Sequence, residues 1–176
     1  LQKLGVNKGD VIGVMAWNNH CHLEVWYGIP GVGAVNHNLK PRLFSEQLIY
    51  IINHANDKIL IIDLDLVPII DKIILDCPNI EKLVILCSKA DLPSTKFSEV
   101  ISYEELLSIG SENFEWIKGE ETDACGICYT SGTTGNPKGV VYTHRSNTLH
   151  ALTQAAPDML NLSSTDKIMP VVPLFH

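Results

Sequence analysis

The 176-residue sequence lacks the features of two large classes of protein, those that span membranes by helices and those that bind nucleic acids. No apolar run approaches the roughly 20 residues that a membrane-spanning helix needs. No basic cluster exceeds two neighbouring cationic residues, and the formal net charge is −7, so a nucleic-acid-binding surface is not expected. The stretch Leu1 to Gly5 has neither an initiator methionine nor the layout of a secretory signal.

The spacing of the cysteines predicts no disulfide framework. The five cysteines are an odd number at irregular intervals, which suits a reducing compartment, so we expect a cytoplasmic protein. Cys125 and Cys128 form a C-x-x-C pattern, but strand positions three apart point to opposite faces. No second cysteine pair or suitable histidine spacing completes a zinc site, so we interpret both residues as small buried thiols.

Short apolar runs alternate with helix-like patterns along the chain. Strands are predicted at 10–17, 33–36, 58–63, 82–86, 124–129, 140–142 and 167–172, and helices at 20–28, 46–55, 65–76, 103–109 and 144–156. The predicted N-caps are Ser45, Ser102 and Thr143. Because the strands are apolar on both faces, we predict an α/β fold with a largely parallel sheet flanked by helices.

The length fits one domain or a large part of one. The polar, acidic stretch 110–123 is interpreted as a solvated connector and as a possible junction between two subdomains.

The most informative stretch is Tyr129-Thr130-Ser131-Gly132-Thr133-Thr134-Gly135-Asn136-Pro137-Lys138-Gly139, which lies between two apolar runs. Glycine permits positive φ and the close approach of a ligand, and successive N–H groups form a nest for an anion. Hydroxyls add donors and lysine adds a positive charge. The mixture favours a polyphosphate with its magnesium ion. The alternative is a hairpin of similar composition that binds nothing.

The Walker A loop, the best-known phosphate loop, does not fit. It has four residues between its first glycine and a Gly-Lys-Ser/Thr sequence, and it opens a helix. If Gly132 is the first glycine, the second glycine position holds Pro137, and Lys138 is followed by Gly139. The residues after Lys138 are β-branched or aromatic, so we predict a strand–loop–strand arrangement.

The loop resembles the signature of the acyl-adenylating superfamily, which includes acyl-CoA synthetases, adenylation domains of peptide synthetases and luciferases. Other segments are similar to fatty acyl-CoA synthetases at similar spacing: Trp17-Asn18, His22-Leu23-Glu24, Pro30 to Val35, Pro41-Arg42-Leu43, Asp123-Ala124-Cys125, Val141 to Ser146 and Pro170 to His176. The similarity is greatest to medium- and long-chain fatty acid–CoA ligases. It implies that residues 1–176 are a partial AMP-binding domain, within the large N-terminal domain of an adenylate-forming enzyme, without its C-terminal domain.

The resemblance also implies roles for individual residues. Thr130 is the candidate for contact with magnesium and ATP, and Lys138 would add positive charge as the loop closes. The alternative for Lys138 is a solvated surface lysine. His176 would lie beside the adenylate and gate or position the acyl group. The remaining phosphate-binding candidates are Ser131, Gly132, Thr133, Thr134 and Gly135.

The implied activity is ATP-dependent conversion of a fatty acid to acyl-AMP and then to acyl-CoA, with Mg2+ as cofactor and coenzyme A as co-substrate. The implied partners are these small molecules, and the family also allows a homodimer. The chain alone is expected to be inactive, because the family's later catalytic segments follow the position of His176. Two alternatives stay open: activation of another carboxylic acid, and a non-catalytic nucleotide-binding remnant.

Overall fold

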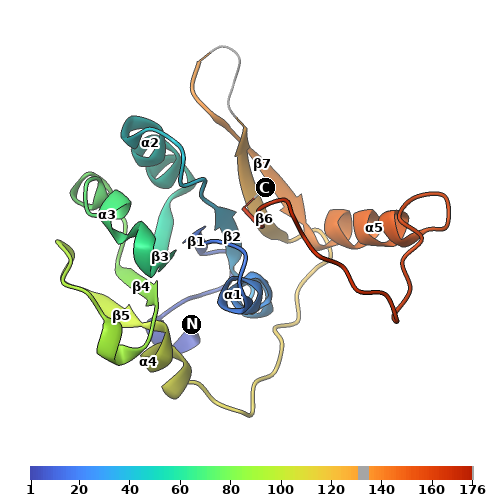
Figure 1. Cartoon of the computed structure of the whole chain (residues 1–176), viewed down its shortest axis with the longest axis horizontal. Helices are drawn as coiled ribbons and strands as arrows, with labels where there is room; N and C mark the ends of the chain where they lie inside the picture. Colours follow the sequence, from blue (N-terminus) through green and yellow to red (C-terminus); the bar gives the residue numbers. More distant parts are fainter. Residues whose placement is uncertain (131–134, 176) are drawn as a thin grey trace.

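A mixed sheet organises the molecule (Figure 1). The computed structural model describes residues 1–130 and 135–175, and within them the strand order is β5-β4-β3-β1-β2-β6-β7. All neighbouring strands are parallel except β7, which runs antiparallel to β6. The strands are β1 (Val11–Met15), β2 (Val35–Asn38), β3 (Asp57–Asp63), β4 (Lys82–Leu86), β5 (Val100–Ser102), β6 (Ala124–Thr130) and β7 (Lys138–Thr143). The predicted α/β fold with a largely parallel sheet is confirmed.

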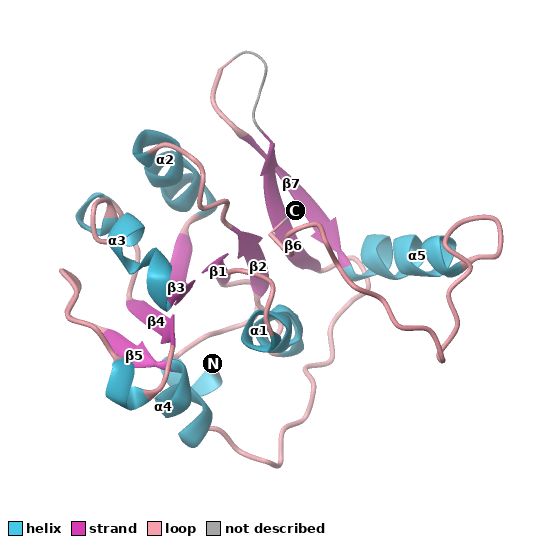
Figure 2. Cartoon of the chain, in the orientation of Figure 1, coloured by secondary structure: helices cyan, strands magenta, loops and turns pink. Residues whose placement is uncertain are grey.

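Helices cover both faces of the parallel part of the sheet (Figure 2). One core packs α2 (Ser45–Ala55) and α3 (Val67–Ile70) against the sheet. The other core packs α1 (His20–Gly31) and α4 (Tyr103–Ser108) against the opposite face. Helix α5 (His144–Ala155) follows β7 and has no buried residue. Short 3-10 helices lie at Gln2–Leu4, Leu64–Leu66, Ile74–Asp76 and Lys89–Asp91.

Two of the predicted N-caps are confirmed. The Ser102 hydroxyl accepts from the Glu105 N–H at 3.1 Å, and the Glu105 carboxylate accepts from the Ser102 N–H at 3.2 Å. The Thr143 hydroxyl accepts from the Ser146 N–H at 3.1 Å. The prediction for Ser45 is wrong by one position, because Ser45 is the first helical residue and Phe44 is the N-cap.

Two predicted elements are wrong. The helix predicted at 65–76 is broken into short α and 3-10 turns. Its buried residues are mostly β-branched, and these have low helix propensity. The strand predicted at 167–172 is absent from the described residues, because an apolar run becomes a strand only when a partner completes its hydrogen-bond ladder. None of the described helices is long and apolar enough to cross a bilayer.

The connector 110–123 is held against the end of α1 and is not wholly solvated. The Trp116 ring covers Gly31 so closely that a Cβ there would lie 2.2 Å from the ring. The Ile117 N–H donates to the Gly31 carbonyl at 3.1 Å, and Lys8 pairs with Asp123 at 2.7 Å. The connector therefore runs against the end of α1 before the chain enters β6.

Candidate nucleotide-binding site

The strand–loop–strand prediction is confirmed by the β6–β7 hairpin. Thr130 pairs with Lys138 at the mouth of the loop, and Tyr129 pairs with Gly139 one step further into the sheet. The Thr130 hydroxyl lies 3.5 Å from the Lys138 carbonyl oxygen. Both residues are exposed, so these two candidates for phosphate contact lie opposite each other where the loop begins and ends.

The rest of the loop is described only from Gly135 onward. Gly135 has φ of 94°, and a Cβ there would meet nothing within 4 Å. The backbone conformation therefore requires glycine at position 135, whereas the surrounding space would admit a side chain. The other loop candidates, Ser131, Gly132, Thr133 and Thr134, lie outside the described residues, as does His176.

An aromatic ring supports the base of the hairpin. A Cβ on Gly139 would lie 3.2 Å from the Tyr129 ring, so the ring occupies the space beside this glycine. The Tyr129 hydroxyl lies 2.6 Å from Nδ1 of His54, in the last turn of α2. Burial, followed by the charge of Asp57, raises the pKa of Tyr129 to about 12. The phenol therefore keeps its proton at neutral pH.

A buried acid–imidazole pair lies next to this ring. Nδ1 of His37 lies 2.8 and 2.9 Å from the two carboxylate oxygens of Asp57, and neither residue is exposed to solvent. The rings of His37 and Tyr129 are 5.0 Å apart. Burial raises the pKa of Asp57, and the neighbouring His37 opposes that shift. Sequence reasoning missed His37, His54 and Asp57.

A second polar contact holds the stretch that precedes His176. The Asn18 side chain accepts from the Leu174 N–H at 2.7 Å and donates to the carbonyls of Pro170 and Val172 at 3.2 and 3.0 Å. The Trp17 and Phe175 rings pack edge to face at 6.3 Å. Asn18 follows β1, so residues 170–175 are held at the carboxyl end of this central strand.

The two cysteines of the C-x-x-C pattern do not act together in the hairpin. Cys125 is buried, and its Sγ lies 3.5 Å from the Tyr142 carbonyl oxygen and 3.2 Å from the Asn147 amide nitrogen. Burial raises the pKa of the Cys125 thiol. Cys128 is half-buried. The interpretation as buried thiols is confirmed for Cys125 and holds in part for Cys128.

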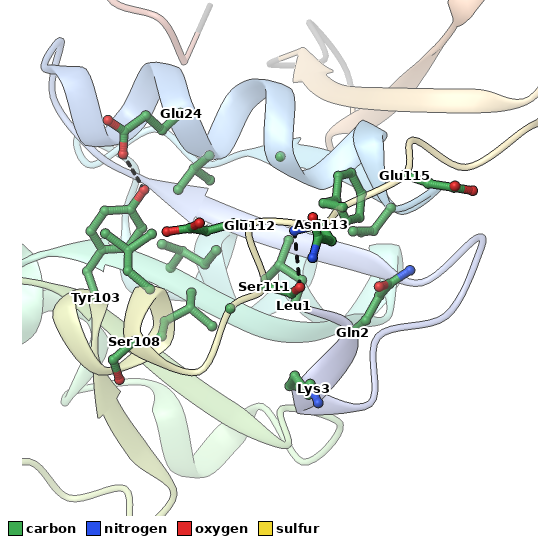
Figure 3. A pocket seen from close by; sticks show the side chains of 18 residues that line it. Leu1, Gln2, Lys3, Glu24, Tyr103, Ser108, Ser111, Glu112, Asn113 and Glu115 are labelled. Carbon is green, nitrogen blue, oxygen red and sulfur yellow. Dashed lines mark hydrogen bonds between the residues drawn. The ribbon is translucent and has the colours of Figure 1, made fainter.

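One cavity lies away from the hairpin. It measures about 1050 Å³ and is lined by the chain's first residues, α1, α4 and the stretch 108–115 (Figure 3). At one side the Tyr103 hydroxyl donates to the Glu24 carboxylate at 2.6 Å. None of its lining residues belongs to β6 or β7, so this cavity is separate from the hairpin that carries the predicted phosphate-binding residues.

The sequence model of one protein family, described as AMP-binding enzyme, matches residues 1–176. The chain belongs to the AMP-binding enzyme family. The predicted resemblance to the acyl-adenylating superfamily is therefore confirmed.

Individual relatives of this AMP-binding chain are CoA ligases. The medium-chain-fatty-acid–CoA ligase of Ectopseudomonas oleovorans is 47% identical over the whole chain, which covers 32% of that relative. The 3-methylmercaptopropionyl-CoA ligase of Ruegeria lacuscaerulensis is 43% identical, again over the whole chain, which covers 33% of it. A crystal structure of a long-chain-fatty-acid-CoA ligase from Archaeoglobus fulgidus has a TM-score of 0.86 at 28% identity, over 99% of this chain and 33% of its own. The chain spans about a third of the length of these curated relatives.

Proposed function

We propose that the protein carrying this segment is a fatty acid–CoA ligase. The observation that supports the proposal is the hydroxyl-, glycine- and lysine-bearing hairpin loop, in a chain that matches the AMP-binding family along its whole length. A carboxylate oxygen of the acid attacks the α-phosphorus of ATP, and the bond to pyrophosphate breaks. Coenzyme A then displaces AMP through its thiol sulfur and gives the thioester. The 176 residues alone are proposed to be inactive.

The hairpin would serve the first step by positioning and charge. The leaving pyrophosphate accumulates negative charge, and stabilising that charge with fixed donors is the main task in phosphoryl-type transfers. Lys138 supplies an exposed ammonium at the mouth of the loop, and Thr130 supplies a hydroxyl opposite it. We propose that N–H and hydroxyl donors between them complete the contact with the β- and γ-phosphates: Ser131, Gly132, Thr133, Thr134 and Gly135.

The donors of the described flanks fit a magnesium ion that arrives with ATP. Magnesium keeps several waters and prefers phosphate oxygens together with one or two protein oxygens. The exposed Thr130 hydroxyl is an oxygen ligand of this kind. When bound, the ion supplies charge neutralisation on the phosphates.

His176 is proposed to gate or position the acyl group beside the adenylate. Its support is the Asn18 contact, which holds the preceding residues 170–175 at the end of β1. We also propose a cytoplasmic location, which is consistent with five free cysteines. A homodimer is a further proposal that sedimentation equilibrium of the purified protein tests.

A second candidate substrate is a short thioether acid. It is favoured by the relative described as a 3-methylmercaptopropionyl-CoA ligase, which is 43% identical to this chain. The two candidates share the adenylating step and differ only in the acid, so one panel of acids distinguishes them.

The test uses the complete open reading frame that carries this segment. ATP–pyrophosphate exchange is measured with acids of increasing chain length and with 3-methylmercaptopropionate, for the wild type, a Lys138→Ala/Thr134→Ala variant and a Lys72→Ala control. The double variant should lose at least about a hundredfold in rate, because single preorganised donors contribute that much in comparable sites. Lys72 is an exposed lysine outside the hairpin, and its variant should match the wild type.

Three outcomes would change the assignment. Normal pyrophosphate exchange in the double variant contradicts the phosphate-loop role. Binding of MgATP without exchange for any acid favours the non-catalytic nucleotide-binding module. Exchange with the thioether acid but with no fatty acid selects the second candidate.

A further inference from the structure

Tyr129 connects three elements at the point where the chain enters the loop. Its ring lies against Gly139 of β7, its hydroxyl lies against His54 of α2, and its face lies near His37 of β2. The next residue along β6, Thr130, opens the loop and pairs with Lys138. A displacement of Tyr129 is therefore passed on to both residues at the mouth of the loop.

Two unusual features of the sheet bring Asp57 and His37 together. These residues belong to β3 and β2, which are separated by the central strand β1. A register shift between Val11 and Ile12 of β1 leaves one extra residue in β3, and such a bulge turns a side chain to the other face. Asp57 thereby faces the side of the sheet occupied by Leu60 and not that of its neighbour Ile59.

The second feature is Gly13, in the middle of β1. A Cβ at this position would lie 2.8 Å from the Asp57 carboxylate and 2.5 Å from the Leu60 side chain. The Asp57 carboxylate therefore reaches His37 by passing over β1, in the space that the missing side chain of Gly13 leaves. Burying two ionisable groups is costly unless they are paired. The Asp57–His37 pair depends on both the bulge and Gly13, so its position is fixed by the sheet. The His37 ring therefore packs in a fixed position beside the Tyr129 ring.

We propose that Tyr129 and His54 are positioning residues of the nucleotide loop, held from beneath by the Asp57–His37 pair. The inference rests on the proposed function, since it assigns the phosphates to the loop between Thr130 and Lys138. Neither residue touches the nucleotide in this proposal. The Tyr129–His54 hydrogen bond fixes the ring, the ring fixes Gly139, and the hairpin presents Thr130 and Lys138 at a fixed separation. Misplacement by about 1 Å is enough to cost a large part of such a contact.

The Tyr129 phenol keeps its proton at neutral pH, so its hydroxyl is able to donate to Nδ1 of His54, 2.6 Å away. Tyr50 stacks on the His54 ring at 5.3 Å and limits its rotation. An asparagine at position 54 places an acceptor near Nδ1, whereas a leucine places none there.

The experiment uses the complete protein with four substitutions: Tyr129→Phe, His54→Leu, His54→Asn and, as the control, Tyr27→Phe. Tyr27 is an exposed tyrosine of α1, so its variant loses a hydroxyl away from the hairpin. We measure the KM of MgATP and of the acid in ATP–pyrophosphate exchange, the Kd of MgATP by calorimetry, and the thermal midpoint. A net hydrogen bond corresponds to about a three- to tenfold change in affinity.

Tyr129→Phe and His54→Leu should raise the KM and Kd of MgATP about three- to tenfold and leave the KM of the acid within about twofold. His54→Asn should restore most of the MgATP affinity, and Tyr27→Phe should resemble the wild type. Unchanged MgATP affinity in folded Tyr129→Phe overturns the inference. Two other outcomes also overturn the inference, because they leave these residues with a structural role only. One is an equal loss of affinity for the acid and for MgATP, together with a lowered thermal midpoint. The other is a His54→Asn variant whose MgATP affinity is no better than that of His54→Leu.

The outcomes separate the inference from the proposed function. If the wild type binds MgATP but exchanges pyrophosphate with no acid, the ligase function fails, and the Kd ratios alone decide the positioning roles. If the wild type is active and the variants keep its MgATP affinity, the function stands and the inference fails. If the wild type binds no MgATP, both are overturned.

Discussion

Replacing Gly13 by alanine is the sharpest test of how the sheet is built. Gly13 lies in the middle of β1 and is not among the glycines with positive φ, so backbone conformation does not require it. Space does: a Cβ would lie 2.5 Å from Cδ2 of Leu60, 2.8 Å from Oδ2 of Asp57 and 3.0 Å from Cδ1 of Leu39. Real Cβ atoms do not approach other atoms so closely, so the carboxylate or the leucines must move.

The expected change in stability follows from three opposing effects. Alanine in place of a strand glycine stabilises by roughly 0.5–1 kcal/mol through backbone entropy. Overpacking a filled core costs about 1–3 kcal/mol. Pushing Asp57 from His37 forfeits about 2 kcal/mol, less than the 3–5 kcal/mol measured when one partner of a buried pair is removed. Gly13→Ala should therefore lower the free energy of unfolding by about 2–4 kcal/mol.

The assay is urea denaturation followed by circular dichroism, with Gly28→Ala as the matched control. Gly28 lies in α1, where a Cβ would meet nothing within 4 Å. Alanine there should stabilise by up to about 1 kcal/mol. If Gly13→Ala proves as stable as Gly28→Ala, then the glycine does not make room for the Asp57–His37 pair, and the reasoning above is refuted.

Two further predictions concern Asn18 and His22. Asn18→Ala removes three hydrogen bonds to residues 170–174, so hydrogen exchange of the Leu174 amide should accelerate about tenfold. Asn18→Asp keeps the acceptor for that amide, so its exchange rate should lie between those of the wild type and Asn18→Ala. Equal exchange rates in all three proteins would contradict the contact. Burial lowers the pKa of His22 from its ordinary 6.5, so the folded protein favours the neutral imidazole. The stability that this residue contributes is therefore fully present above pH 6.5. It is lost as the pH falls below 6.5, by up to about 1.4 kcal/mol per pH unit. Denaturation of His22→Gln should depend less on pH between about 6.5 and 5 than that of the wild type, and parallel curves would show that His22 titrates normally.

Short sequence patterns predicted correctly those elements that depend on neighbouring residues alone. The strand at Lys82–Leu86 matches its prediction at both ends, and the caps at Ser102 and Thr143 form as their short-range pattern requires. The strand–loop–strand arrangement followed from the β-branched residues after Lys138. The same kind of signal failed at 167–172, because an apolar run without a strand partner cannot form a ladder.

The support beneath the loop was not readable from the sequence. His37 contacts a carboxylate 20 residues away, and His54 contacts a phenol 75 residues away. A signal was present in the form of polar residues inside otherwise apolar strands, since Asp57 begins β3 and His37 lies within β2. Such residues are buried only when paired, but the bulge and the glycine that select the partner depend on the register of three strands.

Glycines of one motif are needed here for different reasons. Gly135 has positive φ and open surroundings, so glycine is needed there for the backbone conformation. Gly139 is not among the glycines with positive φ and lies against the Tyr129 ring, so its role is to leave space for that ring. The first glycine serves the loop itself, and the second serves the support that holds its mouth. The motif therefore contains one glycine needed for backbone conformation and another needed for packing, and the structure distinguishes the two.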